Sequence, residues 1–139
     1  MKKNSLKNGF TLIELLVVIF IIGILVALIM ANILGARQRA QDTQRKSDLQ
    51  QLKRALMMYY GENQSYPTAD QVNEPNSVLV PSFIKELPEY NGYVLDVAND
   101  TFRAYVLLDN ISDKDVAISQ SRCGVSSPPD DGAYYVCAD

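Results

Sequence analysis

The sequence contains no histidine and no tryptophan, and only two of its 139 residues are cysteine. Without histidine, the chain cannot use imidazole as a general base, as the partner of a serine or cysteine nucleophile, or as a metal ligand. Two cysteines are too few for a zinc site of four thiolates. The acidic balance, 13 basic against 16 acidic residues, argues against specific nucleic-acid binding, which requires a basic surface. We therefore expect a protein that is not an enzyme and has no cofactor.

Charge is absent from a long stretch near the N-terminus. Leu15–Ala36 contains no charged residue, and 22 of the 27 residues from Phe10 to Ala36 are apolar. As a helix, Leu15–Ala36 rises roughly 33 Å, which is enough to cross a hydrocarbon core about 30 Å thick. The alternative is a buried core helix, but residues 37–139 are too few to enclose one. The stretch predicts a membrane-spanning helix.

The two cysteines lie near the C-terminus, and Cys123 and Cys137 enclose a loop of 13 residues. A disulfide closing this loop would contribute about 3 kcal/mol of stability, but only in an oxidising compartment. The alternative is a pair of buried free thiols. The disulfide interpretation places the C-terminal part outside the cytoplasm. Basic residues do not decide the orientation, because they flank both ends of the apolar stretch: Lys2, Lys3 and Lys7 before it, and Arg37, Arg39, Arg45 and Lys46 after it.

Glu14 is the only charged residue inside the apolar run, and it lies one helical turn after Phe10. A carboxylate deep in a bilayer costs about 2.5–3.5 kcal/mol, so its presence indicates a function and a partner. If the chain were cut after Gly9, Phe10 would carry a free ammonium that could pair with Glu14. The alternative is a carboxylate near the helix end that reaches the headgroups and has no special role.

The residues around Glu14 resemble the leader junction and helix start of type IV pilins and type II secretion pseudopilins. The matching stretch is Lys7-Asn8-Gly9-Phe10-Thr11-Leu12-Ile13-Glu14-Leu15-Leu16-Val17-Val18-Ile19. In that family, a membrane prepilin peptidase cuts after the glycine and methylates the new N-terminus. The resemblance implies cleavage between Gly9 and Phe10 and N-methylation of Phe10. It also implies that Glu14 of one subunit pairs with the Phe10 ammonium of a neighbour during assembly.

The same resemblance implies an α+β fold, in which a long N-terminal helix packs on a small antiparallel β-sheet head. The expected parts are a cleaved basic leader (1–9), an apolar transmembrane and filament-core helix (10–36), an amphipathic continuation (37–60) and a head with a C-terminal disulfide loop (61–139). The implied partners are further copies in a helical filament, the prepilin peptidase, an inner-membrane assembly platform and membrane lipid before assembly. The precursor would span the cytoplasmic membrane once with its head outside, and the mature subunit would enter an extracellular surface filament.

The pattern of residues beyond Ala36 fits this fold. Apolar residues recur at helical spacing and predict one buried stripe, formed by Leu49, Leu52, Leu56 and Tyr59. Gly61 is expected to end the helix. The stretch from Ala55 to Thr68 also resembles the helix end of type IV pilins and major pseudopilins.

Short β-rich segments predict that the head is a small antiparallel sheet covering this stripe. The expected elements are a polar loop at Gln71–Val80, a helical turn at Ser82–Leu87, and strands at Tyr93–Val97, Thr101–Leu108, Val116–Ser119 and Ala133–Cys137. Ala98-Asn99-Asp100 is expected to turn the first two strands into a hairpin.

Three acidic residues, Asp109, Asp113 and Asp115, lie close together in the sequence. Some pseudopilins bind calcium in their heads, so these carboxylates are candidates for a calcium site. The chain lacks the Asp-x-Asp-x-Asp-Gly pattern of an EF-hand, and surface loops are commonly this acidic. The main prediction is therefore that the chain has no metal site.

The main functional interpretation is a structural subunit that polymerises through its N-terminal helix into a type IV pilus-like surface filament. The first alternative is a pseudopilin of a type II secretion or DNA-uptake machine. Major pseudopilins usually carry an Asp-Pro-Trp stretch where this chain has Leu87-Pro88-Glu89-Tyr90-Asn91-Gly92, and this difference and the cysteine pair favour the pilin. The second alternative is a single-span membrane-anchored receptor domain, which would keep its leader.

Overall fold

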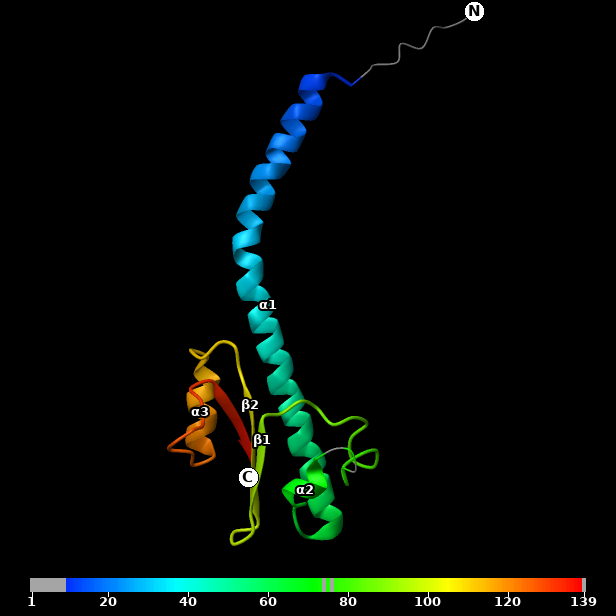
Figure 1. The fold of residues 1–139 in the computed structure, drawn as a ribbon, viewed down its shortest axis with the longest axis vertical. Coiled ribbons are helices and arrows are strands. Elements are labelled where there is room, and N and C mark those ends of the chain that lie inside the picture. The colour runs from blue at the N-terminus through cyan, green and yellow to red at the C-terminus, as the bar shows by residue number, and fades with distance from the viewer. Residues whose placement is uncertain (1–9, 74, 76, 139) are drawn as a thin grey trace, which may run out of the picture. The chain divides into compact units, whose positions relative to one another are not determined.

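The computed structural model describes residues 10–73, 75 and 77–138 (Figure 1). Within them lie three helices and one three-stranded sheet: α1 (Leu12–Asn63), α2 (Ala69–Val72), β1 (Gly92–Asp96), β2 (Thr101–Leu107), α3 (Lys114–Arg122) and β3 (Ala133–Cys137). The chain divides after Arg37 into two compact units, so α1 contributes its first part to one unit and its second part to the other.

The first unit contains the apolar part of α1. Leu12–Met30 is long and apolar enough to cross a membrane, with a mean hydropathy of 3.3, and none of it is buried within the chain. Most large side chains here are about half exposed or more, including Phe20 at 65% and Leu28 at 66%. A soluble helix would bury such a surface, so this part of α1 needs lipid or other subunits around it.

The second unit is built on the other part of α1. The predicted stripe is present, because Leu49, Leu52 and Leu56 are fully buried and Tyr59 packs at the edge of the same core. The opposite wall comes from β2, whose Phe102 is fully buried and whose residues alternate between buried and half-buried. The predicted α+β architecture, with a long helix packed on a small antiparallel sheet, is confirmed.

The sheet has the order β1-β2-β3, and both pairings are antiparallel. It lies between the second part of α1 and α3 (Figure 1). The predicted hairpin joins β1 to β2, and Asp96 holds its turn by accepting hydrogen bonds from the backbone N–H groups of Ala98 and Asn99. Asp100 completes the turn with a φ of 49°. This is the left-handed region, which aspartate and asparagine adopt more readily than most other residues except glycine.

Both predicted ends of α1 differ from the structure. The helix begins at Leu12 instead of Phe10, because Thr11 caps it, as described below. It also continues through Gly61 to Asn63. The chain leaves the helix at Gln64, whose φ of 55° supplies the left-handed conformation that was expected of the glycine.

Two predictions in the head were wrong. Val116–Ser119 was expected to be a strand, but it belongs to α3, which the Asp113 carboxylate caps by accepting from the Asp115 N–H at 2.9 Å. Ser82–Leu87 forms turns without a helix, and the short helix in this region is α2, inside the segment expected to be a loop. The Gln71 side chain stabilises its start by accepting from the Thr68 N–H at 2.9 Å.

Candidate functional site

Two of the predicted site residues lie at the start of α1: Phe10 just before the helix and Glu14 in its first turn. The Glu14 carboxylate oxygen Oε2 accepts hydrogen bonds from the Thr11 N–H at 3.1 Å and the Thr11 hydroxyl at 2.9 Å. The Glu14 N–H in turn lies 3.3 Å from the Thr11 hydroxyl, to which it donates. This reciprocal arrangement is a capping box, which satisfies N–H groups that a helix start leaves without partners.

The capping role of Glu14 was missing from the sequence interpretation, although Thr-x-x-Glu before an apolar run is its usual signature. Both hydrogen bonds that Glu14 accepts from Thr11 use the same oxygen, Oε2. Phe10 is 78% exposed, so the residue expected to carry the new N-terminus is open to a neighbouring molecule. Gly9 lies outside the described residues, and cleavage and methylation at this junction stay predictions.

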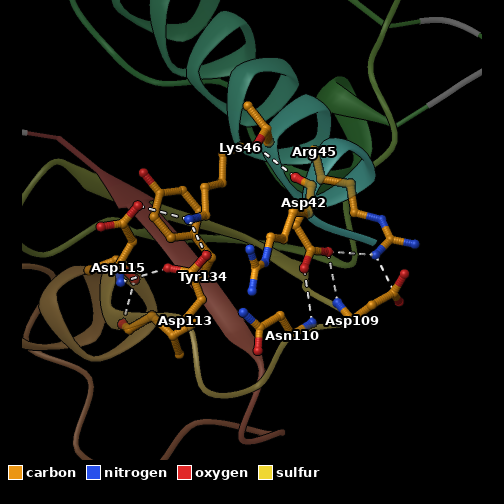
Figure 2. A network of polar contacts seen from close by, with 12 residues as sticks. Asp42, Arg45, Lys46, Asp109, Asn110, Asp113, Asp115 and Tyr134 are labelled. Carbon is orange, nitrogen blue, oxygen red and sulfur yellow. Dashed lines mark hydrogen bonds and ion pairs between the residues drawn. The ribbon is translucent and has the colours of Figure 1, made fainter. Parts of the chain in front are cut away.

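The head contains a second cluster of charges, where α1 meets the loop after β2 (Figure 2). Asp42 is 2% exposed, and its carboxylate accepts from the backbone N–H groups of Asp109 at 2.8 Å and Asn110 at 2.9 Å. Arg45 bridges the carboxylates of Asp42 at 3.2 Å and Asp109 at 2.9 Å. The hydrogen bond to Asp109 raises the pKa of Arg45 above its usual value. Asp42 therefore fixes the loop between β2 and α3 to α1.

Lys46 makes the neighbouring link, from α1 to the start of α3. Its Nζ lies 2.6 Å from Asp113 Oδ2 and 2.8 Å from Asp115 Oδ2, and 5.6 Å from the centre of the Tyr134 ring. Burial opposes the charge on Lys46, but its hydrogen bonds to the two carboxylates outweigh this effect and raise its pKa. The hydrogen bond from Lys46 also lowers the pKa of Asp113.

The structure gives Asp109 a different partner from the other two calcium candidates. Asp109 pairs with Arg45, whereas Asp113 and Asp115 share Lys46. Among the described residues, no three histidine, cysteine, aspartate or glutamate side chains are arranged to hold a metal ion.

The predicted disulfide is present and joins Cys123, which follows α3, to Cys137, the last residue of β3. Its sulfurs close a loop with a sequence separation of 14. Among the described residues there is no free cysteine. The bond attaches α3 to the sheet at the end opposite the Asp113 cap.

We expect Asp42→Ala to lower the free energy of unfolding of the head by about 2–3 kcal/mol, because it leaves two backbone N–H groups without acceptors. Urea unfolding of the full-length chain in detergent, followed by tyrosine fluorescence, measures this loss. Asp48→Ala is the matched control on the same helix. Asp48 accepts from Gln44 and Gln51 of that same helix, so its replacement should change the stability by less than about 0.5 kcal/mol. Equal effects of the two variants would contradict the role given to Asp42.

The ion pairs of Lys46 also predict how stability depends on pH. Folding lowers the pKa of Asp113 from 3.8, so the ionised carboxylate stabilises the folded state. This stabilisation is fully present above about pH 4 and is lost as the pH falls through the pKa of Asp113 in the folded state. Folding raises the pKa of Lys46 above 10.5, so the stabilisation by its ammonium is lost only as the pH rises through that raised pKa. The urea midpoint of the wild-type chain should exceed that of Asp113→Asn at neutral pH. The difference should shrink below about pH 4, and a constant difference would contradict the ion pair.

Comparison with protein families gives two matches that together cover most of the chain. Residues 4–30 match the prokaryotic N-terminal methylation motif. Residues 32–119 match the family described as type II secretion system (T2SS), protein G. The first match contains the junction and Glu14, and the second contains Asp42, Lys46 and the first two strands.

Individual relatives agree with this result. A type II secretion system core protein G of Escherichia coli strain K12 is 36% identical over 112 residues, which are 78% of this chain and 77% of the relative. Proteins with the same description from Aeromonas hydrophila and Vibrio cholerae are 38% and 37% identical. Their alignments cover 60% and 64% of this chain and 66% and 68% of the relatives. No solved structure matches the chain significantly.

Proposed function

This chain belongs to the type II secretion system protein G family, and we propose that it is a pseudopilin, a structural subunit that polymerises inside a secretion machine. Its precursor is anchored in the membrane by one apolar helix near the N-terminus, with the head outside the cytoplasm. The proposed role is structural, because filament subunits act by packing against one another.

One observation carries the proposal: α1 begins with an apolar surface that no described part of the chain covers, interrupted by the carboxylate of Glu14. Lipid can cover this surface in the precursor, and the helices of other subunits can cover it in a filament. A carboxylate in that apolar interior requires a cation. The ammonium of Phe10, freed by cleavage after Gly9 and methylated, would supply this cation from a neighbouring subunit and thereby set the axial register.

The parts of the chain take their proposed roles from this scheme. A prepilin peptidase would remove residues 1–9, and an assembly platform in the membrane would move residues 10–36 from lipid into the filament core. Residues 37–60 would support the head formed by residues 61–139. The homo-oligomer would be a short helical filament within the secretion machine.

Of the sequence-based alternatives, the family match supports the pseudopilin better than the pilus subunit. The preference for a pilin depended on the absent Asp-Pro-Trp stretch and the cysteine pair, both in the head. The match to protein G extends over residues 32–119, which include most of α1 beyond the membrane segment and two strands of the sheet. A membrane-anchored receptor has no use for a methylation motif at its helix start.

Deletion of the gene in the bacterium that carries it tests this proposal. We expect the secretion of type II substrates into the medium to stop, surface pili and twitching motility to remain, and a plasmid copy to restore secretion. Loss of surface pili with normal secretion would instead identify the chain as a pilus subunit.

A further inference from the structure

The disulfide between Cys123 and Cys137 borders a cavity of about 270 Å³. Its two sulfurs differ in access, because Cys137 is buried at 9% exposure in the sheet, whereas Cys123 is partly exposed after the end of α3. Gly124 follows Cys123 and has no side chain, and no described atom beyond its chain neighbours lies within 4 Å of the place where a Cβ would be. A molecule from solution therefore reaches the sulfur of Cys123 more easily than that of Cys137.

Arg103 of β2 is the neighbour of Cys137 across the sheet. The two residues are directly paired in the antiparallel ladder between β2 and β3. The Ala138 N–H donates to the Phe102 carbonyl oxygen at 3.3 Å, so the adjoining pair in the ladder is a hydrogen-bonded one. Because the two kinds of pair alternate, Arg103 and Cys137 form a non-hydrogen-bonded pair. The side chains of such a pair stand on the same face of the sheet and lie closest together.

The charges around the cavity favour an anion at Cys137. Among the described residues, the charged side chains that line the cavity are Arg103, Arg122 and Asp96, which carry two positive charges and one negative. Arg122 is exposed, so water and salt screen its charge. Cys123 is the C-terminal cap of α3, where the helix dipole disfavours a negative charge. A thiolate is therefore more stable at Cys137, beside Arg103, than at Cys123.

We propose that Cys123 is the sulfur at which an external thiol attacks the head, and that Arg103 stabilises Cys137 as the leaving thiolate. The attacking thiolate forms a bond to the sulfur of Cys123, the bond between the two cysteines breaks, and its electron pair leaves with Cys137. The external thiol is thereby oxidised and Cys137 is reduced. In the closing direction, the Cys137 thiolate attacks the mixed disulfide on Cys123 and releases the external thiol.

This division of roles makes Cys123 the site of a reversible modification, the mixed disulfide with a thiol. A thiol of lower pKa leaves faster in the exchange, so a positive charge beside Cys137 speeds the opening of the disulfide. The inference concerns the chemistry of the head and does not depend on the proposed secretion function.

Peptide mapping of the first exchange step tests which sulfur is attacked. The oxidised full-length chain in detergent is treated with 2-mercaptoethanesulfonate at mildly alkaline pH, and excess N-ethylmaleimide stops the reaction after a few per cent of reduction. We expect the added thiol on Cys123 and the maleimide on Cys137. The reverse distribution, or an equal one, would overturn the proposal.

The rate of reduction by the neutral thiol 2-mercaptoethanol tests the role of Arg103. We expect Arg103→Gln to be reduced about fivefold more slowly than the wild type. Arg103→Lys, which restores the positive charge, should recover most of the rate. Arg54→Gln removes an exposed arginine of α1 and is the matched control, which should be reduced at the wild-type rate.

The direction of the change separates this role from a structural one. A head loosened by the loss of Arg103 would expose the disulfide and be reduced faster, whereas loss of leaving-group stabilisation slows the reduction. An unchanged or faster rate for Arg103→Gln would overturn the role of Arg103, and so would equal slowing by Arg103→Lys.

Discussion

Glu14→Val should leave the precursor inserted in the membrane and abolish its assembly into filaments. Valine makes the helix start more apolar, so insertion does not suffer. In the assembled state, however, the ammonium of each mature N-terminus would lie in an apolar interior without a counter-ion. Removing one partner of a buried ion pair costs about 3–5 kcal/mol, or roughly a 150-fold to 4,000-fold loss of affinity at each subunit contact. Membrane fractionation measures insertion, and cross-linking of neighbouring subunits measures assembly.

Glu14→Gln separates the charge of Glu14 from its capping role. Glutamine can take the glutamate position of a capping box, so it can still accept from Thr11, but it cannot neutralise an ammonium. We expect this variant to assemble as poorly as Glu14→Val. Assembly at the wild-type level would mean that Glu14 acts only by capping α1. It would contradict the proposed ion pair between Glu14 and the N-terminal ammonium of a neighbouring subunit.

Replacing both cysteines, Cys123→Ser with Cys137→Ser, should lower the free energy of unfolding of the head by about 3 kcal/mol. The disulfide closes a loop with a sequence separation of 14 and so restricts the unfolded chain. The loss is large for this unit because it is small, and its core depends on one helix stripe and one sheet. Urea unfolding in detergent, with and without reductant, measures the effect.

The reductant provides the control for this double variant. Reduction should destabilise the wild-type chain by about as much as the two substitutions do, and it should leave the double variant unchanged. If the oxidised wild type and the double variant unfold at the same urea concentration, the disulfide does not stabilise the head.

Elements whose residues repeat with a clear period could be predicted from the sequence. Leu49, Leu52 and Leu56 are spaced for one helix face, and that face is the one buried. The alternation in Thr101–Leu107 similarly predicts the central strand. These patterns are reliable because each depends only on the geometry of its own element.

Val116–Ser119 shows where short patterns fail. Its β-branched residues favour a strand, but its neighbours favour a helix, since Asp113 is a good cap and Asp115 lies in the first turn. Val116 and Ser119 then lie one turn apart on the buried face of α3. Four residues are too few to distinguish the two periods, so the capping signal was the better guide.

The polar links of the head could not be predicted, because they join distant parts of the chain. Asp42 and Asp48 lie on the same helix, yet only Asp42 is buried against a loop 67 residues away. Lys46 meets Asp113 across the same sequence distance. From the sequence, Asp109, Asp113 and Asp115 are candidates for a calcium site or ordinary surface residues, and nothing in it connects them with Arg45 or Lys46. Only the packing of α1 on the sheet brings them together.

The mass of the N-terminal peptide from the membrane-extracted protein tests the central claim most directly. A processed filament subunit must lose its leader and expose the amine that Glu14 neutralises. The account predicts a peptide that begins at Phe10 and carries one methyl group on its α-amine. A peptide that begins at Met1 would contradict it, because an uncut chain has no such amine beside the apolar helix.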